Sequence, residues 1–80
     1  MSMEVREKVV EILVNMLGID SSEVTDDANL IRDLGIDSLD YAELVMEFEQ
    51  NFDVKIPDTD AEKLQTVGGI VDYLTSKLEG

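Results

Sequence analysis

The sequence predicts an all-α fold: a small four-helix bundle with three longer helices, one short helix and a long first loop. Apolar residues recur three and four positions apart in three separate segments, which is the period of a helix with one buried face. Glycine and proline separate these segments. The chain has 80 residues, 44% of them apolar, which suits one small core. We therefore expect a single domain over residues 1–80.

The first helix is expected between Ser2 and Gly18, because serine favours a helix start and glycine favours the position after a helix end. Its buried face is expected to comprise Val5, Val9, Ile12, Leu13 and Met16. Residues 19–36 then form a connection so long that it needs anchoring to the core. The expected anchors are Ile19, Val24, Leu30, Ile31 and Leu34. Residues 25–27, Thr-Asp-Asp, are expected to cap a short turn over residues 28–33.

The second helix is expected over about residues 38–51, and its start is the most informative part of the chain. Asp37 suits the N-cap position, because its carboxylate can accept an amide hydrogen from the first turn. Asp40 adds negative charge where the helix dipole is positive. Ser38 is therefore presented at a helix N-terminus close to Gly35, where a phosphate ester would be favoured. The spacing alone favours an ordinary capping serine, since serine is common at helix starts.

The second helix has two different faces when its residues are placed about 100° apart. The face expected to contact the core comprises Tyr41, Leu44, Val45, Phe48 and Phe52. Leu39 and Met46 fall on the opposite face, and the residues beside them are Asp40, Glu43, Glu47 and Gln50. Scattered surface hydrophobes are common. The alternative is a docking face, in which acids steer a partner and Leu39 and Met46 make the dry contact.

Pro57 ends the helical region, because it lacks an amide donor and restricts the preceding residue to extended geometry. Asp58 is expected to cap a short helix that runs to about Leu64. The acidic residues 58–62 lack the glycine and the distal glutamate of an EF-hand calcium loop.

Thr66 is expected to cap the last helix. Its buried face is expected to comprise Val67, Ile70, Val71, Leu74 and Leu78. Gly68 and Gly69 each weaken this helix by about 1 kcal/mol relative to alanine, and they permit close approach of a neighbouring group. The expected core of the whole bundle comprises Val9, Ile12, Leu13, Met16, Leu30, Leu34, Leu44, Val45, Phe48, Phe52, Ile56, Leu64, Val67, Ile70, Val71 and Leu74.

The charge and the missing residue types exclude several classes of function. The net charge of −13 argues against nucleic acid and against anionic membrane surfaces, and it favours basic protein partners. Cysteine and histidine are absent, which argues against disulfides, transition-metal sites and a Ser-His-Asp triad. The sequence has no apolar run that could cross a bilayer and no signal peptide. We expect a cytoplasmic monomer that has no catalytic residues of its own.

An ordered series of motifs resembles the acyl carrier proteins. The series runs through Leu34-Gly35-x-Asp37-Ser38-Leu39-Asp40, Glu43-Leu44-Val45-Met46, Phe52, Ile56-Pro57-Asp58, Ala61-Glu62-Lys63, Thr66-Val67 and Asp72-Tyr73. The resemblance implies that a phosphopantetheinyl transferase attaches 4'-phosphopantetheine to Ser38, and that acyl groups then ride on this arm as thioesters. It also implies delivery to the basic surfaces of acyl-processing enzymes, with fatty acid synthesis as the expected pathway.

The resemblance also implies two sets of residues around Ser38. The set expected to bind partner enzymes comprises Asp37, Leu39, Asp40, Glu43, Met46 and Glu47. The set expected to line the acyl chain comprises Leu30, Ile31, Leu44, Val45, Phe48, Ile56, Leu64 and Ile70. In this context the glycines at 68 and 69 could also admit the acyl chain.

Three features depart from the family pattern. Arg32 and Lys55 replace acids that bind divalent cations in relatives, so we expect no metal site. Tyr41 stands where the family usually has a small or aliphatic residue, and could hydrogen-bond near the arm or reshape the pocket mouth.

Two alternatives to a carrier for fatty acid synthesis stay open. A specialised carrier for polyketide or other lipid synthesis is one alternative. An acidic adaptor bundle with an unmodified Ser38 is the other.

Overall fold

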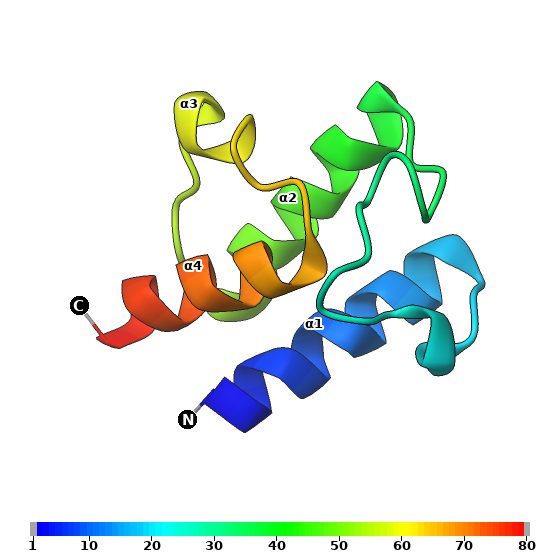
Figure 1. The fold of residues 1–80 in the computed structure, drawn as a ribbon. Helices are drawn as coiled ribbons and strands as arrows, with labels where there is room; N and C mark the ends of the chain where they lie inside the picture. The colour runs from blue at the N-terminus through cyan, green and yellow to red at the C-terminus, as the bar shows by residue number, and fades with distance from the viewer. Residues whose placement is uncertain (1, 80) are drawn as a thin grey trace.

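The computed structural model describes residues 2–79, which form four α-helices and one short 3-10 helix (Figure 1). In chain order the elements are α1 (Ser2–Leu17), η1 (Ser21–Glu23), α2 (Ser38–Phe52), α3 (Asp58–Ala61) and α4 (Val67–Glu79). Residues 2–79 contain no strand, and their only sheet-like feature is an isolated bridge between Asn29 and Thr66. The predicted all-α bundle, with three longer helices and a long first loop, is confirmed.

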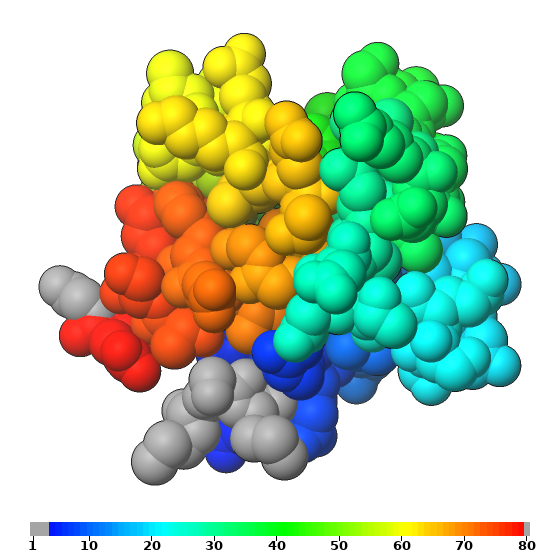
Figure 2. Space-filling model, in the orientation of Figure 1, coloured from blue at the N-terminus to red at the C-terminus, as the bar shows by residue number. Residues whose placement is uncertain are grey.

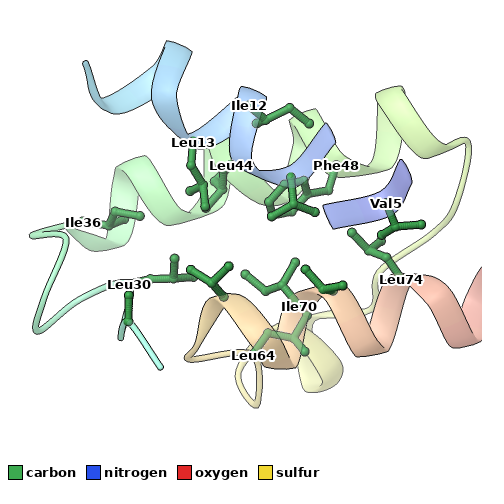
Figure 3. Close-up of a cluster of buried hydrophobic side chains, with 14 of the residues drawn as sticks. Val5, Ile12, Leu13, Leu30, Ile36, Leu44, Phe48, Leu64, Ile70 and Leu74 are labelled. Atoms are coloured by element: carbon green, nitrogen blue, oxygen red, sulfur yellow. The ribbon is translucent and has the colours of Figure 1, made fainter. Parts of the chain in front are cut away.

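Helix α1 packs against both α2 and α4. The short α3 lies in the connection that joins α2 to α4 (Figure 1). The apolar faces of the three long helices enclose one core, with α1 and α2 on one side and α4 on the other (Figure 3). None of the helices within residues 2–79 combines the length and the apolar character that crossing a membrane requires.

The buried residues agree with most of the expected core. The predicted residues that are buried are Val9, Ile12, Leu13, Leu30, Leu44, Phe48, Ile56, Leu64, Val67, Ile70, Val71 and Leu74. Met16, Leu34, Val45 and Phe52 are only partly buried and pack around this cluster. Ala28 and Ile36, which the prediction omitted, are buried, and Val5 joins them. Leu78, expected on the buried face of the last helix, lies in the last turn of α4 and is 49% exposed.

The helix boundaries follow the capping residues that the sequence contains. Gly18 ends α1 with a φ of 66°, a conformation that glycine adopts without steric cost. Helix α2 ends at Phe52, one residue further than expected, and is followed by the C-cap Asp53, whose φ of 54° is left-handed. Thr66 caps α4 as predicted, since its hydroxyl accepts a hydrogen bond from the amide of Gly69 at 3.1 Å.

The short helix corrects one prediction. Asp58 is the first residue of α3 and not its cap, and the helix ends at Ala61 instead of Leu64. The N-cap is Pro57, which makes no side-chain cap hydrogen bond. Its carbonyl oxygen accepts hydrogen bonds from the amides of Asp60 (3.0 Å) and Ala61 (2.9 Å), so the helical pattern begins one residue early.

The long first loop has its own internal caps. Asp20 and Glu23 form a capping box around η1, which the sequence analysis did not predict. The expected turn over residues 28–33 is found over residues 30–34, and it is capped by Asn29 instead of residues 25–27. The side-chain oxygen of Asn29 accepts hydrogen bonds from the amides of Ile31 (3.0 Å) and Arg32 (2.9 Å). An asparagine can fold back in this way because its amide oxygen mimics a backbone acceptor.

A strip of backbone hydrogen bonds fastens this loop to the start of α4. The bonds join the amide of Leu30 to the carbonyl of Gln65 (2.9 Å) and the amide of Val67 to the carbonyl of Ala28 (3.1 Å). Gly68 donates to the carbonyl of Asp26 at 3.0 Å, and a Cβ at this glycine would lie 3.2 Å from that oxygen. The close approach that Gly68 allows is therefore that of the loop backbone, and not that of a helix or an acyl chain.

Candidate functional site

Ser38 is the first residue of α2 and its side chain is exposed. Asp37 is the N-cap as predicted, and its carboxylate accepts a hydrogen bond from the amide of Asp40 at 2.8 Å. The chain reaches this point through Gly35, whose φ of 73° reverses its direction. The serine hydroxyl is therefore presented to solvent at the positive end of a fifteen-residue helix, where a phosphate group is electrostatically favoured.

Two hollows adjoin Ser38. The smaller has a volume of about 250 Å³ and lies between the first loop and the segment after α3. The larger has a volume of about 740 Å³ and is an open groove between α2 and α3. Ser38, Tyr41, Ala61 and Glu62 line both hollows. Figure 2 shows a notch on this side of the molecule, between the yellow residues of α3 and the green residues at the start of α2.

The residues expected to line an acyl chain fall into three groups. Leu30, Ile31 and Leu64 line the smaller hollow, although the side chain of Ile31 is 59% exposed. Val45 and Ile56 line the larger groove. The remaining three, Leu44, Phe48 and Ile70, lie in the closed core with an exposed fraction of 1% each (Figure 3).

Tyr41 occupies the boundary between the two hollows. Its hydroxyl lies within hydrogen-bonding distance of the carbonyl oxygens of Ala61 and Leu64, the latter at 2.7 Å, and shares its one proton between these two acceptors. Burial raises the pKa of Tyr41 above its usual value, so the hydroxyl remains protonated and able to donate at neutral pH. The family resemblance marked Tyr41 as unusual near the expected pocket mouth, and its hydrogen-bond partners lie 20 and 23 residues further along the chain.

A second tyrosine holds α3 from the opposite side. The hydroxyl of Tyr73, on α4, donates to Oδ2 of Asp60 at 2.6 Å. Loss of hydration, this hydrogen bond and the negative charges of Asp60 and Glu49 raise the pKa of Tyr73 to about 12. Helix α3 is thus bonded to α2 through Tyr41 and to α4 through Tyr73. The sequence analysis did not predict the second contact.

The outer face of α2 exposes the apolar residues that the helical phase predicted. Leu39 is 71% exposed and Met46 is 55% exposed. Met46 and Met16 meet at a shallow hollow whose rim includes Glu43 and Glu47. Met16 was expected in the core, and its partial exposure at this rim was not predicted. An acidic surface with exposed methionine and leucine is suited to a basic partner with an apolar patch.

The ion pairs within residues 2–79 leave the acids of this face unneutralised. Both pairs involve α1: Arg6 with Asp26, and Lys8 with Glu11. Lys55 and Glu49 both line the larger groove. The carboxylate of Glu49 accepts a hydrogen bond from the amide of Ile56 at 2.8 Å, a structural role that the sequence did not reveal. Among the described residues, no cluster of acidic side chains is arranged to hold a metal ion.

The bundle and its exposed serine define a class of protein: a small helical domain that presents a serine at a helix N-terminus beside a hollow. Residues 7–74 match the family described as phosphopantetheine attachment site. An acyl carrier protein of Akkermansia muciniphila is 54% identical over 76 residues, which cover 95% of this chain and 94% of the relative. An acyl carrier protein of Thermotoga maritima is 53% identical over 75 residues, which cover 94% of this chain and 93% of the relative.

The solved structures give the same result. The acyl carrier protein of Enterococcus faecalis is similar with a TM-score of 0.83 and 43% identity, over 95% of this chain and 96% of that one. The chain belongs to the acyl carrier protein family, whose members are carriers and not enzymes. Its cofactor is a covalently attached phosphopantetheine. The site fits this group, because Ser38 combines an exposed hydroxyl, a helix N-terminus and an adjoining hollow.

Proposed function

We propose that this chain carries acyl groups on a phosphopantetheine arm at Ser38 and delivers them to the enzymes of fatty acid synthesis. The arm supplies a thiol that holds the acyl group as a thioester. The protein presents the arm at the start of α2, shelters the cargo in the hollows beside Ser38, and docks through the outer face of α2. Tethering raises the effective concentration of the cargo at each partner enzyme. We further propose that the chain acts as a monomer in the cytoplasm.

The position of Ser38 carries this proposal. Ser21 and Ser22 lie in the three-residue η1, and Ser76 lies in the last turns of α4, where the helix dipole is unfavourable for an anion. Ser38 opens a long helix, as Ser2 does at the start of α1, and Ser38 also lines two hollows.

Intact-mass measurement after incubation with coenzyme A and a phosphopantetheinyl transferase tests the attachment site. Wild type should gain the mass of one phosphopantetheinyl group, and Ser38→Ala should gain none. Ser21→Ala is the matched control, because Ser21 is also exposed and also directly follows an acidic N-cap, Asp20. It should gain the group as wild type does. A mass gain in Ser38→Ala would show that another residue is modified and would overturn the assignment.

The docking proposal rests on the charge and exposure of the outer face of α2. It assigns partner contacts to Leu39 and Met46 and electrostatic steering to Asp37, Asp40, Glu43 and Glu47, as expected from the sequence. Unneutralised acids raise the rate of encounter with a basic partner, and the gain falls as salt screens the charges. The exposed apolar pair then supplies contact area that excludes water.

The transferase itself serves as the probe for docking. The double variant Glu43→Lys and Glu47→Lys should lower kcat/KM for pantetheinylation about tenfold or more at low ionic strength and flatten its salt dependence. The control is Glu4→Lys with Glu7→Lys, which makes the same charge change on exposed positions of α1. If both double variants lose the same activity, net charge and not the face of α2 controls the encounter.

The pathway is tested by the cargo that the protein holds. A carrier for fatty acid synthesis should be recovered with a homologous series of acyl groups, some saturated and some with an oxygen on the β carbon. Mass spectrometry of the arm measures these groups. A specialised carrier, for which Tyr41 is the supporting observation, should instead be recovered with one dominant acyl group.

A further inference from the structure

Tyr41 is placed between Ser38 and the interior of the bundle. It lies one turn after Ser38 on α2, and both residues line both hollows. The next residues along the core face of the same helix are Leu44 and Phe48, which are closed off from solvent. A chain that starts at Ser38 and enters the core between α2 and α3 therefore meets the ring of Tyr41 first.

The hydroxyl of Tyr41 also closes this route from the other side. It is bonded to the carbonyl oxygens of Ala61, the last residue of α3, and of Leu64, three residues further on. These two carbonyls belong to the segment that faces α2 across the hollows. The side chain of Tyr41 thus spans from α2 to this segment. Its hydrogen bonds to both carbonyls must break before α2 and the segment can separate.

The hollow that leads from Ser38 towards the buried residues Leu30 and Leu64 is small, whereas the groove of about 740 Å³ between α2 and α3 is open. The hollow in front of Tyr41, lined by Leu30, Ile31 and Leu64, has a volume of about 250 Å³. An apolar cavity of about 150 Å³ accommodates a benzene molecule, so this hollow has room for on the order of six to ten carbon atoms. A longer chain that is sheltered beyond this hollow, and not in the open groove, needs the volume that Tyr41 and the closed core now fill.

We propose that Tyr41 is a specificity-determining residue that sets the length of acyl chain this carrier shelters. Chains of short and medium length lie in the hollow in front of Tyr41. Longer chains are sheltered beyond that length only when the Tyr41 hydroxyl is displaced from Ala61 and Leu64. The inference rests on the proposed function, because it takes the cargo to be attached at Ser38.

The test compares melting temperatures of the phosphopantetheinyl protein carrying saturated acyl groups from butyryl to palmitoyl. A sheltered chain removes apolar surface from water and stabilises only the folded state, so the melting temperature rises with each sheltered carbon. In wild type the rise should level off near octanoyl or decanoyl. In Tyr41→Val it should continue to longer chains. Tyr41→Phe retains the ring and loses the hydroxyl. The chain length at which its melting temperature levels off should therefore increase, but by less than in Tyr41→Val.

Tyr73→Phe is the matched control. Tyr73 also donates its hydroxyl to α3, through Asp60, but it lines neither hollow. Its removal should lower all melting temperatures alike and leave the levelling length unchanged. A shift in Tyr73→Phe equal to that in the Tyr41 variants would mean that loosening α3 is sufficient, and the inference would be wrong.

The remaining outcomes separate the inference from the proposed function. If wild type does not accept the arm at Ser38, the proposed function fails. If all variants are loaded and the levelling length is the same in each, the proposed function stands and the role of Tyr41 is refuted. Should Tyr41→Val fail to fold, the comparison of Tyr41→Phe with Tyr73→Phe decides, since both replace only a hydroxyl group.

Discussion

Replacing Asp37 by alanine should destabilise the whole domain through the start of α2. The change removes the acceptor that the amide of Asp40 contacts at 2.8 Å. Loss of an N-cap acceptor costs about 1 kcal/mol, within a range of about 0.5–2 kcal/mol. For a domain of this size, about 1 kcal/mol corresponds to a fall of about 4–8 °C in melting temperature. Thermal unfolding followed by circular dichroism measures this shift directly.

In Asp37→Ala the loss of the cap hydrogen bond destabilises the fold, whereas the loss of a negative charge stabilises it. A second substitution, Asp37→Asn, separates these two effects. Removing Asp37 also removes one negative charge close to Asp33 and Asp40, and relief of such repulsion is worth a few tenths of a kcal/mol. The cap should therefore dominate. Asp37→Asn removes the charge but retains an acceptor of similar capping strength, so it should lose less than half as much as Asp37→Ala. Equal losses in the two variants would show that the carboxylate charge, and not the hydrogen bond, holds the helix start.

Three further predictions concern stability. Because the pKa of Tyr73 is raised to about 12, the folded state keeps a proton that the unfolded state loses above about pH 10, so the free energy of unfolding should fall between about pH 10 and 12. Urea unfolding should show a shallower fall in Tyr73→Phe, and an unchanged slope would contradict the assignment. Gly35→Ala places a side chain at a φ of 73° and should cost about 1–2 kcal/mol, again by urea unfolding; no loss would mean that the turn relaxes. Sodium chloride should raise the melting temperature, because screening shortens the repulsion of the net charge of −13 to about 3 Å at 1 M. Calcium chloride at matched ionic strength should add little, because Arg32 and Lys55 interrupt the acidic clusters; a much larger calcium effect would reveal a specific site.

The start of α2 was predictable because its determinants are adjacent in the sequence. Asp37 caps the helix through a residue three positions away, and the helical period alone places Leu39 and Met46 on the outer face. The start of α3 was misplaced because aspartate suits both the cap and the first turn of a helix. The start of α3 is set by the carbonyl of Pro57, which accepts hydrogen bonds from the helix. Every residue has a backbone carbonyl, so the residue type does not reveal this role.

Other features depend on partners that are distant in the sequence. The hydroxyl of Tyr41 bonds to carbonyls that lie 20 and 23 residues away, and Glu49 caps the amide of Ile56 although it resembles a surface acid. Backbone acceptors are present at every position, so a sequence cannot show which of them a side chain will contact. The predicted acyl-chain residues differ in exposure in the same way. The position of α3 in the fold decides which of them are exposed, partly exposed or closed off from solvent.

The backbone strip between residues 26–30 and residues 65–68 sets an order of events during folding. It joins segments from opposite halves of the chain, so the entropy of closing a long loop must be met before its hydrogen bonds form. Helix α2 is capped from within its own neighbourhood and has no such requirement. We therefore expect α2 to become protected from hydrogen exchange earlier than the strip, and the hollow lined by Leu30 and Leu64 to be completed last. An incompletely folded chain would then already present Ser38 to a modifying enzyme, whereas it could retain a cargo only after the two halves have joined.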